Sequence, residues 1–350
     1  MSAILDKSYL AIKKAIKSAL PKSQKIKLHE WIVRKRLEKN KLKPHVPPEL
    51  CFSLTSICNA KCTFCAYTYV DTPKEIMKFD VFKKAIDDYT SLGGQAINLT
   101  PLTGEVLVDP HLFEKIGYAK GTEKIKKVGF ATNAILLNRF DNYKKIIDAN
   151  VDWMQISSPG FDDEAYKRVY QTNQYENILA GIKNMLEYKK ETKSPIEIFV
   201  ILRVDRHFED VVKDEGYKQL LPYIEEKLIE IKMDKEYHLS MDSWCDQITD
   251  DKLTGLMFVK PVTTEKPLIP CTRMIWNLSV LPRGDVRVCS CRYYETEYDD
   301  MVVGNLKEES LGEILTGKKW QKMLSDIIKE NKWPTACKNC SYYGPMGVDQ

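Results

Sequence analysis

The stretch Cys58-Asn-Ala-Lys-Cys62-Thr-Phe-Cys65 places three cysteines at CxxxCxxC spacing, directly after a strand-like apolar run from Leu50 to Leu54. Three thiolates can hold a [4Fe–4S] cube while one iron keeps no protein ligand, and a substrate or cofactor can chelate that open iron. The alternative for clustered cysteines is a zinc site, which more often uses four ligands in CxxC pairs. The spacing therefore favours a cluster that takes part in chemistry.

This loop resembles that of the radical S-adenosylmethionine (radical SAM) superfamily, and the aromatic Phe64 before the third cysteine is typical of it. In that superfamily the open iron binds the amino and carboxylate groups of the methionine moiety, and the reduced cluster cleaves the sulfonium to a 5′-deoxyadenosyl radical. The resemblance implies that Cys58, Cys62 and Cys65 are metal ligands, that Phe64 lies at the cofactor, and that SAM is this cofactor.

Length and composition bound the class of protein. With 350 residues, 43% of them hydrophobic and 29% charged, the chain is long enough for one large α/β unit and a small appended domain. No apolar run approaches the roughly 20 residues that cross a bilayer, and the N-terminus lacks the features of a signal peptide. We therefore expect a cytoplasmic protein, in which ten cysteines point to metal binding rather than to disulfides.

Basic side chains are concentrated at the start of the chain. The first 50 residues carry 13 Lys and Arg against 4 Asp and Glu, and the remainder carries 40 against 45. Two amphipathic helices are expected here, Ser8 to Leu20 and Gln24 to Lys39, separated by Pro21. They can contact a membrane surface, a nucleotide-linked substrate or an acidic partner, but packing on the barrel with the lysines in water is favoured. No nucleic-acid partner is expected, because no basic patch interleaved with aromatic residues stands out beyond this arm.

Strand-like and helical patterns alternate after the arm, which predicts a parallel sheet of βα units. The resemblance to radical SAM proteins implies an α/β fold built on an open, partial (β/α)6 barrel of the TIM type. We expect a basic helical arm at 1–48, the partial barrel at 49–250 and a small α+β domain at 251–350. The strand candidates are Leu50–Ser56, Gln95–Pro101, Lys127–Asn133, Val151–Ser158, Ile196–Val204 and Tyr237–Trp244.

The segment after the second strand candidate matters because chemistry in such barrels gathers at the C-terminal ends of the strands. Thr103-Gly104-Glu105 resembles the family's GGE motif, with Thr103 in place of the first glycine. The resemblance implies that this backbone and Glu105 engage the methionine amino group, since an ammonium group needs acceptors. The alternative is a plain turn with an acidic helix cap.

Polar residues also follow the next three strand candidates. Thr132 and Asn133 can offer hydrogen bonds to a ribose or to the methionine carboxylate. Ser157 resembles the family's ribose-contacting serine, although a serine there could also cap the following helix. Arg203 could bind a carboxylate or form a surface ion pair.

Cysteines return near the C-terminus. Cys271, Gly284 and Cys289 follow a CX12GX4C spacing that resembles SPASM and twitch domains, and Cys337-Lys-Asn-Cys340 comes later. The resemblance implies that one auxiliary [4Fe–4S] cluster without an open iron is bound by Cys271, Cys289, Cys337 and Cys340, and that it conducts electrons. Two alternatives stay open: Cys291 could replace Cys289, and a zinc ribbon could use the same cysteines.

Two cysteines remain. Cys51, inside the first strand candidate, is expected to be a small core residue. Cys245 ends the sixth candidate and so is expected to face the barrel mouth, where its thiol could return a hydrogen atom to a substrate radical. The alternative is an inert cysteine.

The resemblance implies an enzyme that generates a 5′-deoxyadenosyl radical and removes hydrogen from a substrate, which we expect to be a sugar, cyclitol or nucleotide-sugar. Loss of a further electron and proton would complete a dehydrogenation, whereas hydrogen return by Cys245 would give an epimer. The alternative is a maturase of a ribosomally synthesised peptide, whose acidic leader the basic arm could hold. An electron donor such as flavodoxin or ferredoxin is an expected partner.

Overall fold

The structure is a computed structural model that describes residues 46–71, 73–232, 239–262, 277–289 and 300–338, with residues 21, 24, 270, 271, 273, 274, 340 and 341. The two predicted helices of the basic arm lie outside the described residues except for Gln24, the first residue of the second helix, and Cys291 lies outside them as well.

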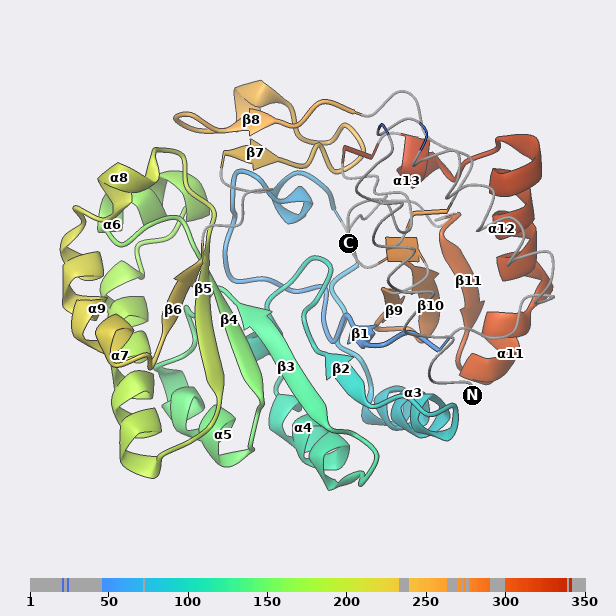
Figure 1. Cartoon of the computed structure of the whole chain (residues 1–350), viewed down its shortest axis with the longest axis horizontal. Coiled ribbons are helices and arrows are strands. Elements are labelled where there is room, and N and C mark those ends of the chain that lie inside the picture. Colours follow the sequence, from blue (N-terminus) through green and yellow to red (C-terminus); the bar gives the residue numbers. More distant parts are fainter. Residues whose placement is uncertain are drawn as a thin grey trace.

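One sheet of nine strands runs through the molecule in the order β11-β10-β9-β1-β2-β3-β4-β5-β6. Its six successive parallel strands form the open partial barrel that was predicted, so the mixed α/β class is confirmed (Figure 1). These strands are β1 (Leu50–Phe52), β2 (Ala96–Asn98), β3 (Lys127–Thr132), β4 (Trp153–Ser158), β5 (Glu197–Leu202) and β6 (Glu230–Lys232).

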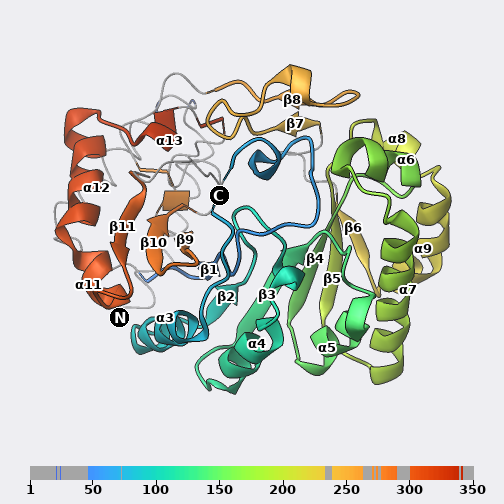
Figure 2. The same ribbon diagram turned by 180° about the vertical axis from the view of Figure 1, so that it is seen from behind.

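Helices cover the outer side of these strands, as Figures 1 and 2 show from opposite sides. The packing follows from amphipathic sequence: in the first of these helices Phe82 is fully buried, and its ring lies 4.9 Å from that of Phe52 in β1. The helices are α3 (Phe79–Ser91), α4 (Leu112–Gly121), α5 (Asn142–Asp148), α6 (Asp163–Ala165), α7 (Tyr175–Thr192), α8 (Phe208–Val211) and α9 (Glu215–Glu225). None of the helices within the described ranges is long and apolar enough to cross a membrane.

The prediction of Tyr237–Trp244 as the sixth strand of the barrel is wrong for its described part, residues 239–244. The strand that pairs with β5 is β6, directly after α9, whereas β7 (Ser240–Met241) pairs in parallel with β8 (Phe258–Val259) in a separate two-stranded sheet. β6 holds a single aliphatic residue, Ile231, between Glu230 and Lys232, so it carries little of the apolar alternation by which a strand is recognised.

The C-terminal part continues the barrel sheet. β9 (Leu278–Val280) pairs in parallel with β1, and β10 (Asp285–Val288) and β11 (Val302–Asn305) follow as antiparallel neighbours. β9 and β10 form a hairpin, with Gly284 at φ +96° in its turn. Helices α11 (Leu311–Thr316) and α12 (Lys318–Glu330) follow these strands, and α13 (Thr335–Lys338) contains Cys337. The boundary between the partial barrel and the C-terminal domain, expected between residues 250 and 251, stays a prediction.

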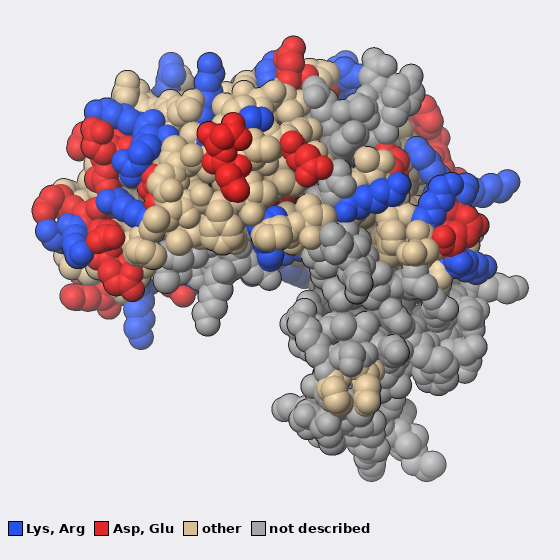
Figure 3. Space-filling model, turned by 90° about the horizontal axis from the view of Figure 1, so that it is seen from above, with Lys and Arg blue, Asp and Glu red and all other residues tan. Residues whose placement is uncertain are grey.

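Charges of both signs are interspersed on the face seen from above (Figure 3). Blue Lys and Arg side chains alternate with red Asp and Glu side chains around a mainly uncharged central area, over the coloured part of the surface.

A buried ion pair holds α4 against the loops near the barrel mouth. Lys115 Nζ donates to Asp109 Oδ2 at 2.5 Å and to the Met77 carbonyl at 2.6 Å, and neither charged side chain is exposed. Because removing one partner of a buried pair leaves the other charge uncompensated, the pair is expensive to break.

We expect Lys115→Met to lower the free energy of unfolding by about 3–5 kcal/mol, because Asp109 then stays buried without its cation. Urea unfolding of the cluster-free protein, followed by tryptophan fluorescence, measures the loss. The matched control is Lys120→Met, which breaks the half-exposed pair with Asp152 and should cost below about 1 kcal/mol. Equal losses in the two variants would contradict this reading.

Candidate cluster and cofactor site

The cysteine loop after β1 is docked on an irregular helix that follows β4. The backbone N–H of Lys61 donates to the Tyr170 carbonyl at 3.3 Å, and that of Thr63 donates to the Val169 carbonyl at 2.9 Å. Both carbonyls belong to a π-helical turn, Tyr166–Tyr170. The Phe64 ring packs 5.8 Å from the Tyr170 ring. Turns of this type are rare and frequently occur at functional sites.

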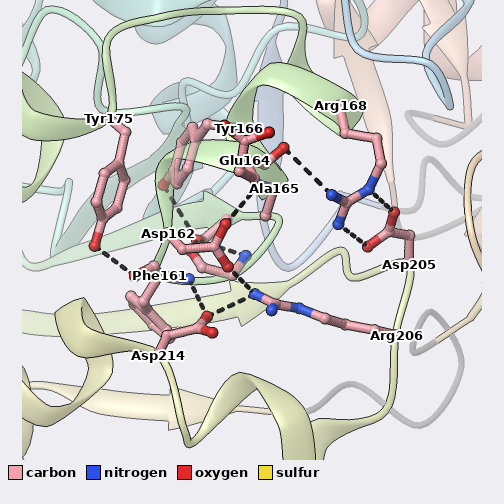
Figure 4. Close-up of polar contacts among 12 residues, drawn as sticks. Phe161, Asp162, Glu164, Ala165, Tyr166, Arg168, Tyr175, Asp205, Arg206 and Asp214 are labelled. Carbon is pink, nitrogen blue, oxygen red and sulfur yellow. Dashed lines mark hydrogen bonds and ion pairs between the residues drawn. The ribbon is translucent and has the colours of Figure 1, made fainter.

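Two arginines fix this π-helical turn to the segment after β5 (Figure 4). Arg168 forms a two-pronged ion pair with Asp205, at 2.5 Å from Nε and 2.9 Å from Nη2. Arg206 bridges Asp162 and Asp214, and the Asp214 carboxylate also accepts from a backbone N–H in the loop after β4. Bidentate arginine–carboxylate pairs have a fixed geometry. The π-helical turn that contacts the cysteine loop is therefore held in place by ion pairs at Asp205 and at Arg206.

The three cysteines of the loop have properties that suit a metal centre. Burial raises the pKa of Cys58 to about 12 and that of Cys65 to about 11, and burial with the neighbouring thiols raises the pKa of Cys62 well above its ordinary value. Such thiols become thiolates only when a cation compensates their charge. All three cysteines are half-buried.

Two kinds of metal centre differ in what they ask of these cysteines. A [4Fe–4S] cube bound by three thiolates takes one of them on each of three irons, whereas a zinc ion takes all its ligands on one atom. Among the residues that the structure describes, no three His, Cys, Asp or Glu side chains are gathered to hold one metal ion.

Glu105 joins the loops after β2 and β3. Its Oε1 accepts from the Thr132 hydroxyl at 2.6 Å and from the Leu107 N–H at 3.1 Å, and its Oε2 accepts from the Asn133 N–H at 2.8 Å. Its own N–H donates to the Ile57 carbonyl in the cysteine loop at 2.9 Å. Burial raises the pKa of Glu105, and the hydrogen bonds oppose that rise. A carboxylate offers about four acceptor positions, so these donors leave one at Oε2.

Gly104 allows the closest approach between the two loops. It has φ +139°, and a Cβ there would lie 2.6 Å from the Thr55 carbonyl oxygen and 3.2 Å from that of Ile57. Any side chain would push the loop after β2 away from the cysteine loop. The neighbouring Thr103, which replaces a glycine of the motif, is buried.

The remaining predicted residues lie at the ends of β3, β4 and β5, and Asn133 contacts the cysteine loop. Asn133 Nδ2 donates to Asn59 Oδ1 at 2.8 Å and lies 3.9 Å from Cys58 Sγ. Ser157 Oγ lies 2.6 Å from the Tyr170 hydroxyl. Burial and the charge of Cys62 raise the pKa of Tyr170, and the charge of Arg203 opposes them.

Tyr170 is the residue of this site that the sequence did not reveal. It contacts Phe64 and Ser157, and its carbonyl holds Lys61. No spacing or motif marks it, because its role depends on a π-helical turn that local propensity does not predict.

The C-terminal cysteines form a second buried group. Cys271, Cys289, Cys337 and Cys340 are all buried. Burial raises the pKa of Cys337, and the neighbouring thiols of Cys340 and Cys271 add to the rise. Cys337 Sγ is also 3.9 Å from the sulfur atoms of Met274 and Met301. The ligand set stays a prediction.

Cys245 lies against this second group. Its buried thiol is 3.9 Å from the Ala336 carbonyl in α13, next to Cys337, whereas the sequence placed it facing the barrel mouth. The turn of Trp244, Cys245 and Asp246 has positive φ at all three residues, which is uncommon for residues other than glycine. Trp244 Nε1 donates to the Phe64 carbonyl at 3.1 Å, so the turn contacts both cysteine-bearing parts. The hydrogen-donor role of Cys245 stays a prediction.

Comparison with known proteins identifies two families. The model of the radical SAM superfamily matches residues 52–214, and that of SPASM, an iron–sulfur cluster-binding domain, matches residues 271–341. GTP 3′,8-cyclase of Chlorobaculum tepidum is 28% identical over 136 residues, which cover 38% of this chain and 39% of the relative. Probable GTP 3′,8-cyclase of Methanococcus maripaludis is 29% identical over 136 residues, covering 39% and 44%. The chain thus matches about two fifths of the length of these curated relatives.

Solved structures with the same fold extend over most of the chain. Streptococcus suis SuiB bound to the precursor peptide SuiA has a TM-score of 0.56 at 12% identity, covering 90% of this chain and 78% of that one. BtrN in complex with AdoMet and 2-DOIA has a TM-score of 0.51 at 15% identity, covering 84% and 92%. Native anSMEcpe with bound AdoMet has a TM-score of 0.52 at 17% identity, covering 83% and 89%. These structures share the fold, and the two family models, matched at residues 52–214 and 271–341, show that the chain belongs to the radical SAM superfamily and carries a C-terminal SPASM iron–sulfur domain.

Proposed function

We propose that this chain binds SAM beside a [4Fe–4S] cluster held by Cys58, Cys62 and Cys65, and removes a hydrogen atom from a small polar substrate such as a sugar, cyclitol or nucleotide-sugar. When bound, the cluster and SAM supply a 5′-deoxyadenosyl radical. The observation that carries the proposal is the convergence of the loops after β1, β2 and β3 on Glu105, which keeps one acceptor position at Oε2.

The chain's own residues provide for binding and orientation of SAM. Oε2 of Glu105 is proposed to accept from the methionine ammonium, while Gly104 lets its backbone approach the cysteine loop. Asn133 lies at Cys58 and is proposed to bind the methionine carboxylate or the ribose through its amide. Ser157 and Arg203, grouped around Tyr170, would orient the ribose and a carboxylate. Phe64 and Tyr170 supply an aromatic wall that excludes water.

The presence of the second group of cysteines supports dehydrogenation as the reaction. After one hydrogen atom leaves a carbinol carbon, the substrate radical must lose one electron and one proton to become a ketone. The buried thiols of Cys271, Cys289, Cys337 and Cys340 are proposed to hold a second [4Fe–4S] cluster as acceptor for that electron. A small electron carrier such as flavodoxin or ferredoxin is the proposed partner that reduces the N-terminal site.

The second candidate is a maturase of a ribosomally synthesised peptide. It is supported by the likeness to SuiB, which is described as bound to a precursor peptide and resembles 90% of this chain. The basic arm at 1–48 is then the proposed contact for an acidic leader, or for a membrane surface if the substrate is lipid-linked. The likeness to GTP 3′,8-cyclases instead supports a nucleotide-containing substrate.

Iron content tests the two cysteine groups. Anaerobically reconstituted protein should contain about eight irons per chain, and the triple variant Cys58→Ala/Cys62→Ala/Cys65→Ala about four, because each group holds one cube. Colorimetric iron and sulfide analysis measures both. Cys51→Ala, which alters a buried cysteine in β1 that is not a predicted ligand, should keep the full content. One zinc per group in place of iron would refute the assignment.

We expect Glu105→Gln to weaken SAM binding about 10- to 100-fold while iron content is kept, because an amide offers fewer acceptors and sets an N–H group against the donors around it. Equilibrium dialysis of SAM against the reconstituted protein gives the dissociation constant. The matched control is Glu49→Gln, a carboxyl with a burial-raised pKa before β1, at the opposite end of the sheet. Unchanged affinity in Glu105→Gln would remove Glu105 from the binding site.

Product analysis in deuterated water separates the reactions. Anaerobic incubation with a metabolite extract and SAM should give a product that is two electrons more oxidised and carries no solvent deuterium at the reacting carbon. Epimerisation would instead give an isomer with one solvent deuterium, and Cys245→Ala would stop it while 5′-deoxyadenosine still forms. Modification of a supplied precursor peptide, with no change among small metabolites, would establish the maturase. Mass spectrometry follows all three outcomes.

A further inference from the structure

Arg287 is a cation in the interior of the C-terminal part. It is the largest fully buried side chain among the described residues, with a relative exposure of 0%. It lies in β10, opposite Ser279 of β9, and Ser279 is in turn opposite Cys51 of β1. Because residues directly opposite one another in a sheet point to the same face, Arg287 points to the face that carries Ser279 and Cys51.

The guanidinium of Arg287 contacts the backbone of one C-terminal cysteine. Its Nη1 donates to the Cys289 carbonyl at 2.5 Å. Because Arg287 is fully buried, this contact fixes a positive charge beside the backbone of one of the four proposed ligands.

This placement has an electrostatic consequence for the group that the cysteines are proposed to hold. A cube with four thiolates is an anion, and it gains one further negative charge on reduction. Burying an anion is unfavourable unless a cation compensates it, and the benefit of the cation is greater for the more negative state. Net charge and hydrogen bonding around a cluster are known determinants of its reduction potential.

We propose that Arg287 is the built-in counter-charge of the auxiliary site, a positioning residue that raises the reduction potential there and so favours transfer of one electron from the substrate radical. The proposal rests on the proposed function, since it requires a cluster at these cysteines. The proton lost in the same oxidation goes to solvent or to a base on the substrate side.

The test uses the variant Cys58→Ala/Cys62→Ala/Cys65→Ala as the parent, because only the auxiliary cluster then contributes to the signal. The midpoint potential is measured by redox titration with electron paramagnetic resonance of frozen samples. Arg287→Met should shift the midpoint to a more negative value, and Arg287→Lys, which keeps the charge, should stay near the parent. Arg283→Met removes an exposed arginine from the turn of the same hairpin and should leave the midpoint unchanged.

A second variant keeps the test decisive if Arg287→Met does not assemble a cluster. Ser279→Asp places a carboxylate opposite Arg287 without removing it, and neutralising the guanidinium in this way should also make the midpoint more negative, whereas Ser279→Asn should not. An unchanged midpoint in Arg287→Met or Ser279→Asp, or an equal shift in Arg287→Lys, would overturn the counter-charge role. A parent protein without any cluster would refute the auxiliary site itself, which separates failure of the proposed function from failure of this inference.

Discussion

The two backbone hydrogen bonds between the cysteine loop and the π-helical turn are the contacts on which the site depends. They run from Lys61 and Thr63 to the carbonyls of Tyr170 and Val169, so a loop after the first strand is held by an element after the fourth. The turn is itself anchored by Arg168 to Asp205 after β5. Cluster ligands must keep a fixed mutual geometry, and here that geometry is supported by ion pairs rather than by the loop alone.

Two buried polar residues at this end of the sheet, Glu105 and Asn133, each have several hydrogen-bond partners. Glu105 receives three donors from two loops, and Asn133 connects that carboxylate to the cysteine loop through its backbone and side chain. A network of this kind makes the positions of its members interdependent, because leaving a buried donor or acceptor without a partner costs free energy. Substituting one member is therefore expected to move the others, so binding and geometry change together.

The two cysteine groups differ in their electrostatic surroundings. The N-terminal thiols are half-buried, and the contacts around them are a carboxylate, amides and aromatic rings. The C-terminal thiols are buried and have the guanidinium of Arg287 nearby. The N-terminal thiols are thus partly exposed, whereas the C-terminal thiols are buried near a fixed positive charge. This difference suits the proposed division between a site that initiates radical chemistry and a site that accepts an electron.

Much of the fold and the site was determined by local sequence. Cysteine spacing, the Gly104-Glu105 turn and the alternation of strand and helix patterns are properties of short segments, and the structure confirms the partial barrel and brings Glu105, Thr132 and Asn133 together at Cys58. The tertiary structure alone decided that β6 rather than Tyr237–Trp244 joins β5, that β9 adds to β1, and that Cys245 lies beside Cys337. These depend on contacts between segments far apart in the chain, and a strand's partner is set by packing across the whole sheet rather than by its own residues. For the same reason the roles of Tyr170 and Arg287 were visible only once their neighbours were in place.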